Sequence, residues 1–370
     1  MIIFGTRPEV IKLAPVIEEL HKYNDFFEPI TLTTGQHREM LQQILDVFGI
    51  KPDFNLKLMK ENQTLSYLTS KAVEKLSDLI NKVKPDYILV QGDTTTAMVA
   101  ALVGFYHKIP VGHVEAGLRT YNRYSPFPEE MNRRLIGVLA LHHFAPTRNA
   151  MSALLKEGVD KKQIFLTGNT VVDALLKIVN SGQLRNFDFL NPSRKLILVT
   201  AHRRENWGRG IKNICEALKK IIGMYKDIEI VYPVHLNPNV RNTVFRILDN
   251  TERIYLIDPV NYIELISLMK LAYLILTDSG GIQEEAPVLG KPVLVMRDST
   301  ERPEGIEAGV ARLVGTDPYK IVSSVTELIE NEDTYKAMAQ AKSPYGDGKA
   351  AQRIVNIIAE YFKSSNFLRI

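Results

Sequence analysis

Short runs of β-branched and apolar residues alternate along the chain with longer stretches in which apolar positions recur every three or four residues. The first pattern is typical of buried strands and the second of amphipathic helices. The short runs form two series: residues 1–4, 29–34, 87–91, 110–114, 142–146 and 163–167, and then 195–201, 228–233, 253–257, 273–277 and 292–296. Strands that alternate with helices in this way predict parallel sheets covered on both faces.

One segment interrupts this order. Residues 181–194 contain Gly, Pro, Asn and Ser with little periodicity, which is typical of a linker. We therefore predict an α/β fold of two doubly wound, Rossmann-like lobes that face a cleft, at residues 1–180 and 181–348. A final helix is predicted from residue 349 to residue 362, after the break P-Y-G-D-G. We expect the segment 349–370 to pack back on the first lobe.

Composition narrows the class of protein. The length of 370 residues suits two domains, and 45% apolar residues suffice for two cores. The net charge of +4 is carried by scattered basic residues, which argues against a nucleic-acid partner. The single cysteine, Cys215, excludes an internal disulfide and a C-x-x-C zinc site. No apolar run approaches the roughly 20 residues of a membrane helix, and no signal peptide is recognisable, so we expect a cytoplasmic protein.

The strongest candidate for an anion site is T-D-S-G-G-I-Q-E-E, residues 277–285. A predicted strand ends at Thr277 and a helix begins near Ser279, so the free N–H groups of the helix start suit a phosphate. Gly280 and Gly281 would let the backbone approach a ligand. The alternative is an ordinary capped helix with acidic residues in its first turn.

Basic residues follow strands in both predicted lobes. The first lobe opens with G-T-R-P-E, in which Arg7 is followed by Lys12, but neither G-x-G-x-x-G nor the P-loop pattern occurs. The second lobe opens with T-A-H-R-R-E-N, which contains His202 and Arg203. His235 follows a further strand, and residues 297–309 form a long polar loop. Solvated basic loops are the alternative interpretation of these segments.

Three carboxylates follow successive elements of the first lobe. Asp93 lies in Q-G-D-T-T, Glu115 in G-H-V-E-A-G, and Glu129 in F-P-E-E-M-N-R. Asp93 could simply cap a helix, and Glu129 could only interact with a helix dipole. Together, the three carboxylates could meet at one site and act as general acid and base. Neither Asp-x-Asp nor His-Glu-x-x-His is present, so no motif requires a metal.

These motifs occur in an order that strongly resembles the non-hydrolysing UDP-N-acetylglucosamine 2-epimerases. The similarity runs from about residue 2 to about residue 362 and also includes Y-P-V-H-L-N-P and T-E-R-P-E-G-I-E-A-G. The resemblance implies the two-lobed glycosyltransferase-B architecture. It also implies interconversion of UDP-N-acetylglucosamine and UDP-N-acetylmannosamine without a metal or nicotinamide cofactor, and a homodimer.

The resemblance further implies roles for individual residues. Asp93, Glu115 and Glu129 would be the acid–base groups, and His202 would assist the departure of UDP. Glu285 would hold the ribose, and the uracil would lie near Val260 and Leu265, where relatives often have Phe in place of Leu265. The residues expected around the diphosphate are Arg7, Lys12, His202, Ser279, Gly280, Gly281 and Arg302.

A second, regulatory UDP-N-acetylglucosamine site occurs in bacterial relatives, and Gln36, His37, Arg203 and His235 are its candidates here. Glu39 and Asn62 stand where those relatives favour Gln and Arg, and the loss of a cation argues against that regulation.

The expected chemistry follows from the substrate, because the sugar C2–H has no neighbouring carbonyl and is not acidic. Loss of UDP with the C2 proton would give 2-acetamidoglucal, and UDP would then add back. The sequence leaves open which carboxylate takes the proton and which donates it. A two-lobed glycosyltransferase and a catalytically silent nucleotide-sugar sensor are the rival functions.

Overall fold

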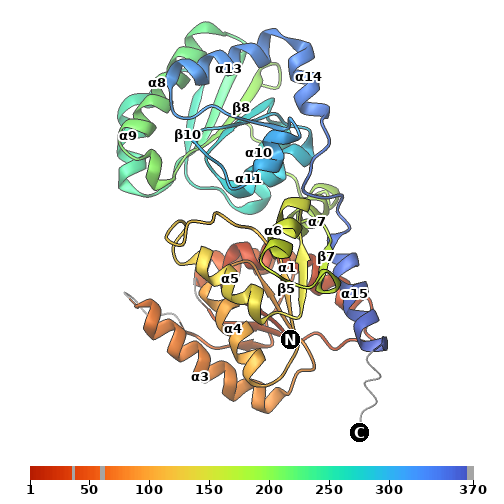
Figure 1. The fold of residues 1–370 in the computed structure, drawn as a ribbon. Coiled ribbons are helices and arrows are strands. Elements are labelled where there is room, and N and C mark those ends of the chain that lie inside the picture. The colour runs from red at the N-terminus through yellow and green to blue at the C-terminus, as the bar shows by residue number, and fades with distance from the viewer. Residues whose placement is uncertain (36–37, 59–62, 365–370) are drawn as a thin grey trace. The chain divides into compact units, whose positions relative to one another are not determined.

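The computed structural model describes residues 1–35, 38–58 and 63–364 (Figure 1). The chain divides into two compact units: unit 1 is Met1–Leu176 with Tyr345–Ile370, and unit 2 is Lys177–Pro344. The chain enters unit 2 inside helix α7 (Thr170–Asn180), a few residues before the predicted boundary at 181. The predicted linker, residues 181–194, contains neither helix nor strand.

Unit 1 is built on a parallel sheet in the order β3-β2-β1-β4-β5-β6-β7. Its strands are β1 (Ile2–Phe4), β2 (Thr31–Thr33), β3 (Phe54–Asn55), β4 (Ile88–Gln91), β5 (Val111–Val114), β6 (His142–Ala145) and β7 (Ile164–Leu166). Its helices, besides the start of α7, are α1 (Arg7–His21), α2 (Arg38–Phe48), α3 (Leu65–Val83), α4 (Thr95–Tyr106), α5 (Glu129–Leu139), α6 (Arg148–Lys156) and α15 (Ala350–Ser364).

Unit 2 is built on a second parallel sheet in the order β10-β9-β8-β11-β12-β13. Its strands are β8 (Lys195–Thr200), β9 (Ile228–Pro233), β10 (Ile254–Ile257), β11 (Leu274–Thr277), β12 (Val293–Val295) and β13 (Ala311–Leu313). Its helices are α8 (Arg209–Met224), α9 (Pro238–Leu248), α10 (Tyr262–Leu271), α11 (Gly280–Glu285), α12 (Pro303–Glu307), α13 (Pro318–Glu330) and α14 (Glu332–Gln340). The predicted fold class, two parallel α/β sheets, is confirmed.

The order of strands reverses once in each sheet. In unit 1 the reversal lies between β1 and β4, and in unit 2 it lies between β8 and β11. At such a switch point the connections leave on opposite faces, and the space beyond the carboxyl ends of the two strands is the usual ligand site. The segments that leave these strands begin with Gly5 and Gly92 in unit 1, and with Ala201 and Asp278 in unit 2.

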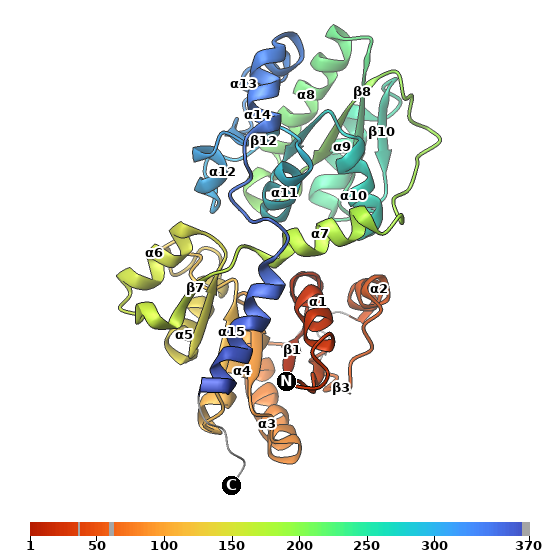
Figure 2. The same cartoon turned by 90° about the vertical axis from the view of Figure 1, so that its right-hand side faces the viewer.

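Helix α15 belongs to unit 1 although it is the last helix of the chain. It packs against α1 (Figure 2), and its residues Ile354, Val355 and Ile358 are buried. Within the described ranges, no helix combines the length and the apolar character that a membrane span requires.

Candidate active site

Helix α11 begins at the carboxyl end of β11 in unit 2. Ser279 occupies its N-cap position, but the Ser279 side chain makes no capping hydrogen bond. The Ser279 N–H instead donates to Thr277 Oγ1 at 2.9 Å. The ordinary capped helix that the sequence offered as an alternative is therefore not formed through Ser279, and the helix start suits an anion.

Gly280 is required by the approach of an arginine side chain. A Cβ atom on Gly280 would lie 3.2 Å from Arg302 Cζ, closer than ordinary van der Waals contact. Arg302 Nε donates to Glu284 Oε1 at 2.9 Å, and Glu284 is buried. The glycine thus allows the guanidinium group, which is paired with Glu284, to lie against the first turn of α11. Both Gly280 and Arg302 were predicted from sequence to belong to one diphosphate site.

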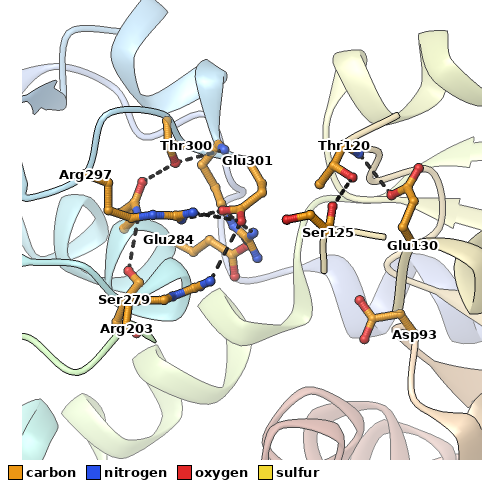
Figure 3. Close-up of polar contacts among 12 residues, drawn as sticks. Asp93, Thr120, Ser125, Glu130, Arg203, Ser279, Glu284, Arg297, Thr300 and Glu301 are labelled. Carbon is orange, nitrogen blue, oxygen red and sulfur yellow. Dashed lines mark hydrogen bonds and ion pairs between the residues drawn. The ribbon is translucent and has the colours of Figure 1, made fainter. Parts of the chain in front are cut away.

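A second arginine, in the loop that carries Arg302, was not singled out by the sequence. The buried Arg297 donates from Nη1 to Glu301 Oε2 at 2.6 Å (Figure 3). Its Nε donates to Glu205 Oε1, also at 2.6 Å. Burial opposes ionisation of Glu301, but its bonds to Arg297 outweigh burial and hold the pKa of Glu301 at about 2. Glu301 also lies 3.8 Å from both Arg203 and Arg302. One carboxylate is therefore hydrogen-bonded to Arg297 and lies within ion-pair distance of two further arginines.

Asp278 fixes the segment that follows β8. Its fully buried Oδ2 accepts the N–H groups of His202 and Arg203, each at 2.9 Å. Its Oδ1 lies 3.5 Å from His202 Nδ1. Burial lowers the pKa of His202, although Asp278 opposes this effect. His202 also stacks on His235, with ring centroids 5.5 Å apart. His202 is therefore held as a neutral ring beside Asp278, the residue that leads into the start of α11.

The remaining predicted residues of unit 2 lie in helices α10 and α11 or in the loop that precedes α10. Glu285 is buried and accepts a hydrogen bond from the Tyr262 hydroxyl at 2.7 Å. Tyr262 was not anticipated from the sequence. Val260 lies in the loop before α10, and Leu265 lies within α10; both are half-buried. Gly281 is the second residue of α11.

Glu115 is the centre of a buried network in unit 1. It forms an ion pair with Lys12 and accepts hydrogen bonds from Gln91 Nε2 at 3.2 Å and Asn169 Nδ2 at 3.0 Å. Its φ of 64° lies in the left-handed region, which costs a non-glycine residue roughly 1–2 kcal/mol. The network offsets this strain, so the carboxylate is held rigidly at the end of β5.

Asp93 lies at the end of the neighbouring strand, β4. Its Oδ2 accepts from Arg133 Nε at 2.7 Å, and its main-chain oxygen accepts from Asn132 Nδ2 at 2.9 Å. The alternative that Asp93 caps the next helix is wrong. Thr94 is the N-cap of α4, and its side chain accepts from the Ala97 N–H, because the chain turns one residue later than the sequence suggested.

Glu129, the third predicted carboxylate, has different surroundings from the adjacent Glu130. Glu129 is the first residue of α5 and is half-buried, and no hydrogen bond or ion pair of its side chain occurs within the described ranges. Glu130 is fully buried, accepts the N–H groups of Thr120 and Tyr121, and contacts Arg133 at 3.2 Å. Glu130 therefore has a structural role, whereas Glu129 is available to a ligand.

Two motif residues prove to be structural. Glu9 of G-T-R-P-E accepts the N–H groups of Gly5 and Thr6 and the Thr94 hydroxyl, and burial raises its pKa. His113 donates from Nε2 to the Gly92 oxygen at 2.7 Å, and burial lowers its pKa to about 3. The contacts of Glu9 and His113 fix the turns after β1 and β4. Arg7, from the same motif as Glu9, is the first residue of α1 and not a loop residue.

The predicted regulatory residues fall into two groups. Arg203 and His235 lie in unit 2, as described above. Gln36, His37, Asn62 and the side chain of Glu39 lie outside the described residues. The described residues contain no cluster of three or more His, Cys, Asp or Glu side chains that could hold a metal ion.

Comparison with known proteins gives a consistent result. A model of the family described as UDP-N-acetylglucosamine 2-epimerase matches residues 18–359. The chain is 53% identical over 365 residues to the UDP-N-acetylglucosamine 2-epimerase of Escherichia coli K12, covering 96% of this chain and 97% of that protein.

Solved structures agree with this similarity. The UDP-GlcNAc 2-epimerase of Neisseria meningitidis, solved with UDP-GlcNAc bound, superposes with a TM-score of 0.90 at 48% identity, covering 97% of this chain and 99% of that one. The S. aureus protein MnaA, solved with UDP, has a TM-score of 0.89 at 48% identity, covering 98% and 96%. The fold is therefore of the predicted glycosyltransferase-B type, and the chain belongs to the UDP-N-acetylglucosamine 2-epimerase family of isomerases.

Proposed function

We propose that this enzyme reversibly converts UDP-N-acetylglucosamine to UDP-N-acetylmannosamine by eliminating UDP and adding it back. The proposal for the mechanism depends on one observation. Asp93 and Glu115 follow the adjacent strands β4 and β5, at the carboxyl ends of the strands, where ligands usually bind in such sheets. Glu129, at the start of α5, is the third acid–base candidate. The overall reaction is supported by the family to which the chain belongs.

Elimination explains why several carboxylates are needed. In the first step a carboxylate takes the C2 proton, the C1=C2 double bond forms, and the C1–O bond breaks with its electron pair on the UDP oxygen. The product is 2-acetamidoglucal. In the second step the UDP oxygen re-forms the bond to C1, and a proton is delivered to the opposite face of C2. Groups on both faces of the ring are therefore required.

The residues of unit 2 suit the leaving group. The first turn of α11 and Arg302 would stabilise the negative charge that develops on UDP, as preorganised electrostatics. His202, which its lowered pKa keeps neutral near pH 7, would donate a hydrogen bond to the departing diphosphate. The Arg297–Glu301 pair would hold the loop that carries Arg302.

In unit 1, Lys12 and Arg7 would contribute further positive charge. Glu285 and the loop at Val260 would hold the nucleoside.

A single incubation tests the reaction. The protein is mixed with UDP-N-acetylglucosamine in D2O, without metal or acceptor, and the sugar is followed by NMR. We expect deuterium at C2 and formation of the manno epimer. A glycosyltransferase or a nucleotide-sugar sensor would give no exchange at C2, and that result would falsify the proposal.

The assignment of Asp93 is tested separately. Asp93→Asn removes the acid–base carboxylate while keeping its shape, so we expect exchange to fall by on the order of 100-fold or more with UDP binding unchanged. Unchanged turnover would remove Asp93 from the catalytic groups while leaving the overall reaction intact.

A further inference from the structure

Helix α5 places one cation between two carboxylates. Arg133 is buried, and its Nη2 and Nε lie 2.6 and 2.7 Å from Asp93 Oδ2. Its Nη1 lies 3.2 Å from Glu130 Oε2, and Glu130 is fully buried. Arg133 and Glu130 are three residues apart and share one face of the helix. The proposed mechanism uses Asp93 but assigns no role to Arg133.

The contacts of Arg133 are confined to one oxygen of Asp93. Both Nε and Nη2 contact Oδ2, whereas Asp93 Oδ1 has no hydrogen bond or ion pair within the described ranges. The Asp93 side chain is 23% exposed, in contrast to the fully buried Glu130. An arginine that engages one carboxylate oxygen fixes the rotation of the carboxylate, so Oδ1 points to a defined place.

The main chain at Asp93 is held by other residues. Asn132 Nδ2 donates to the Asp93 oxygen, His113 Nε2 donates to the Gly92 oxygen, and the Thr94 side chain caps α4. Removal of the Arg133 side chain therefore leaves the turn after β4 with its own supports. Apart from its contact with Glu130, the Arg133 side chain therefore acts on the carboxylate of Asp93 and not on the main chain of this turn.

Glu130 links the same arginine to the loop after β5. It accepts the N–H groups of Thr120 and Tyr121, and Thr120 Oγ1 donates to the Ser125 oxygen at 2.6 Å (Figure 3). This loop leads from Glu115 to α5. Glu130 thus fixes the far end of Arg133, so that the guanidinium group cannot rotate away from Asp93.

We propose that Arg133 is a positioning residue for the reaction: held by Glu130, it orients Asp93 so that Oδ1 faces the sugar. The inference rests on the proposed function, because it takes Asp93 as an acid–base group. Arg133 itself is not expected to touch the substrate. Its loss should therefore lower kcat and leave KM and UDP affinity nearly unchanged.

The test uses Arg133→Ala and Arg133→Lys, with C2 deuterium exchange as the assay. Arg134→Ala is the matched control, because Arg134 is the next residue of α5, is exposed, and lies 3.7 Å from Glu157 instead of Asp93. A small misplacement of a reacting group costs on the order of 100-fold, so we expect kcat of Arg133→Ala to fall by about that factor with KM within about threefold. Arg134→Ala should retain wild-type kcat.

Rescue separates positioning from folding. Guanidinium ion at millimolar concentration should restore part of the kcat of Arg133→Ala but not alter the control. Arg133→Lys keeps the charge and loses the paired donors, so its kcat should lie between those of Arg133→Ala and wild type even if Arg133→Ala folds poorly. Wild-type kcat in Arg133→Lys, absence of rescue, or an equal loss of UDP affinity would overturn the inference. Absence of exchange in the wild-type protein would instead refute the proposed function.

Discussion

At the scale of residues, the contact between Gly280 and Arg302 gives a test of the diphosphate site. In Gly280→Ala the new Cβ would lie 3.2 Å from Arg302 Cζ, so the guanidinium group must move by a few tenths of an ångström or more. We expect UDP affinity to fall by about 1–2 kcal/mol, roughly tenfold, because a charge-assisted contact is misplaced. Isothermal titration with UDP measures this change.

A double-mutant cycle separates two causes of this loss. If Gly280→Ala acts through Arg302, the substitution should cost little further affinity in an Arg302→Ala background. If the added methyl group collides with UDP itself, the cost should persist in that background. The second outcome would contradict an effect transmitted by Arg302 but would still locate UDP at α11.

The candidate site was predictable in part because its residues lie within three positions of the end of a strand. Asp93, Glu115, His202 and Gly280 all stand where a parallel strand ends, and this position is visible in the sequence. The partners that orient them are less visible. Asn169 lies 54 positions from Glu115, and Tyr262 lies 23 positions from Glu285, so only the folded chain brings each pair together. For the pairing of Arg133 with Glu130 the sequence holds only a weak signal, namely that the two residues are three positions apart on one helix.

At the scale of elements, Asp173 links α7 to the start of α15. Its Oδ1 accepts the Ala351 N–H at 2.9 Å, and its buried Oδ2 has no hydrogen bond. Burial raises the pKa of Asp173 to about 6. Since the folded pKa lies above the ordinary value of 3.8, the protonated form favours folding. This contribution is present below about pH 4 and is lost as the pH rises through 6.

Asp173→Asn should remove this dependence, because the amide keeps the acceptor oxygen and carries no charge. Relative to wild type, the variant should gain on the order of 1–2 kcal/mol in the free energy of unfolding between pH 4 and pH 7, after allowance for solvent screening. Denaturant unfolding at both pH values measures the difference between the two proteins. An equal difference at pH 4 and pH 7 would show that Asp173 does not titrate with a raised pKa.

The elements themselves differed in how well the sequence predicted them. All eleven predicted strands occur within two residues of their expected bounds, for example Ile228–Pro233. The strands β3 (Phe54–Asn55) and β13 (Ala311–Leu313) were not anticipated. Both lie at sheet edges and have only two and three residues, too few to show an alternating pattern.

At the scale of the whole molecule, the chain forms two cores that are joined twice by the backbone. Unit 1 contains two separate stretches of sequence, since α15 returns to pack on α1. Unit 2 is one continuous stretch, and its core includes the fully buried Leu218. In unit 1, Ile354 of α15 is also fully buried. If each unit is held by its own core, loss of packing in one should not loosen the other.

Ile354→Ala and Leu218→Ala test this independence as a matched pair. Each removes buried methyl and methylene groups, and a cost of about 2–5 kcal/mol is expected for either. In hydrogen exchange, Ile354→Ala should raise exchange in β1 and α1 as well as in α15, although α1 and α15 are more than 300 residues apart in sequence. Leu218→Ala should raise exchange only in unit 2. Equal loosening of both units by either substitution would show that the two cores unfold together, and the division at Leu176 and Tyr345 would then have no energetic meaning.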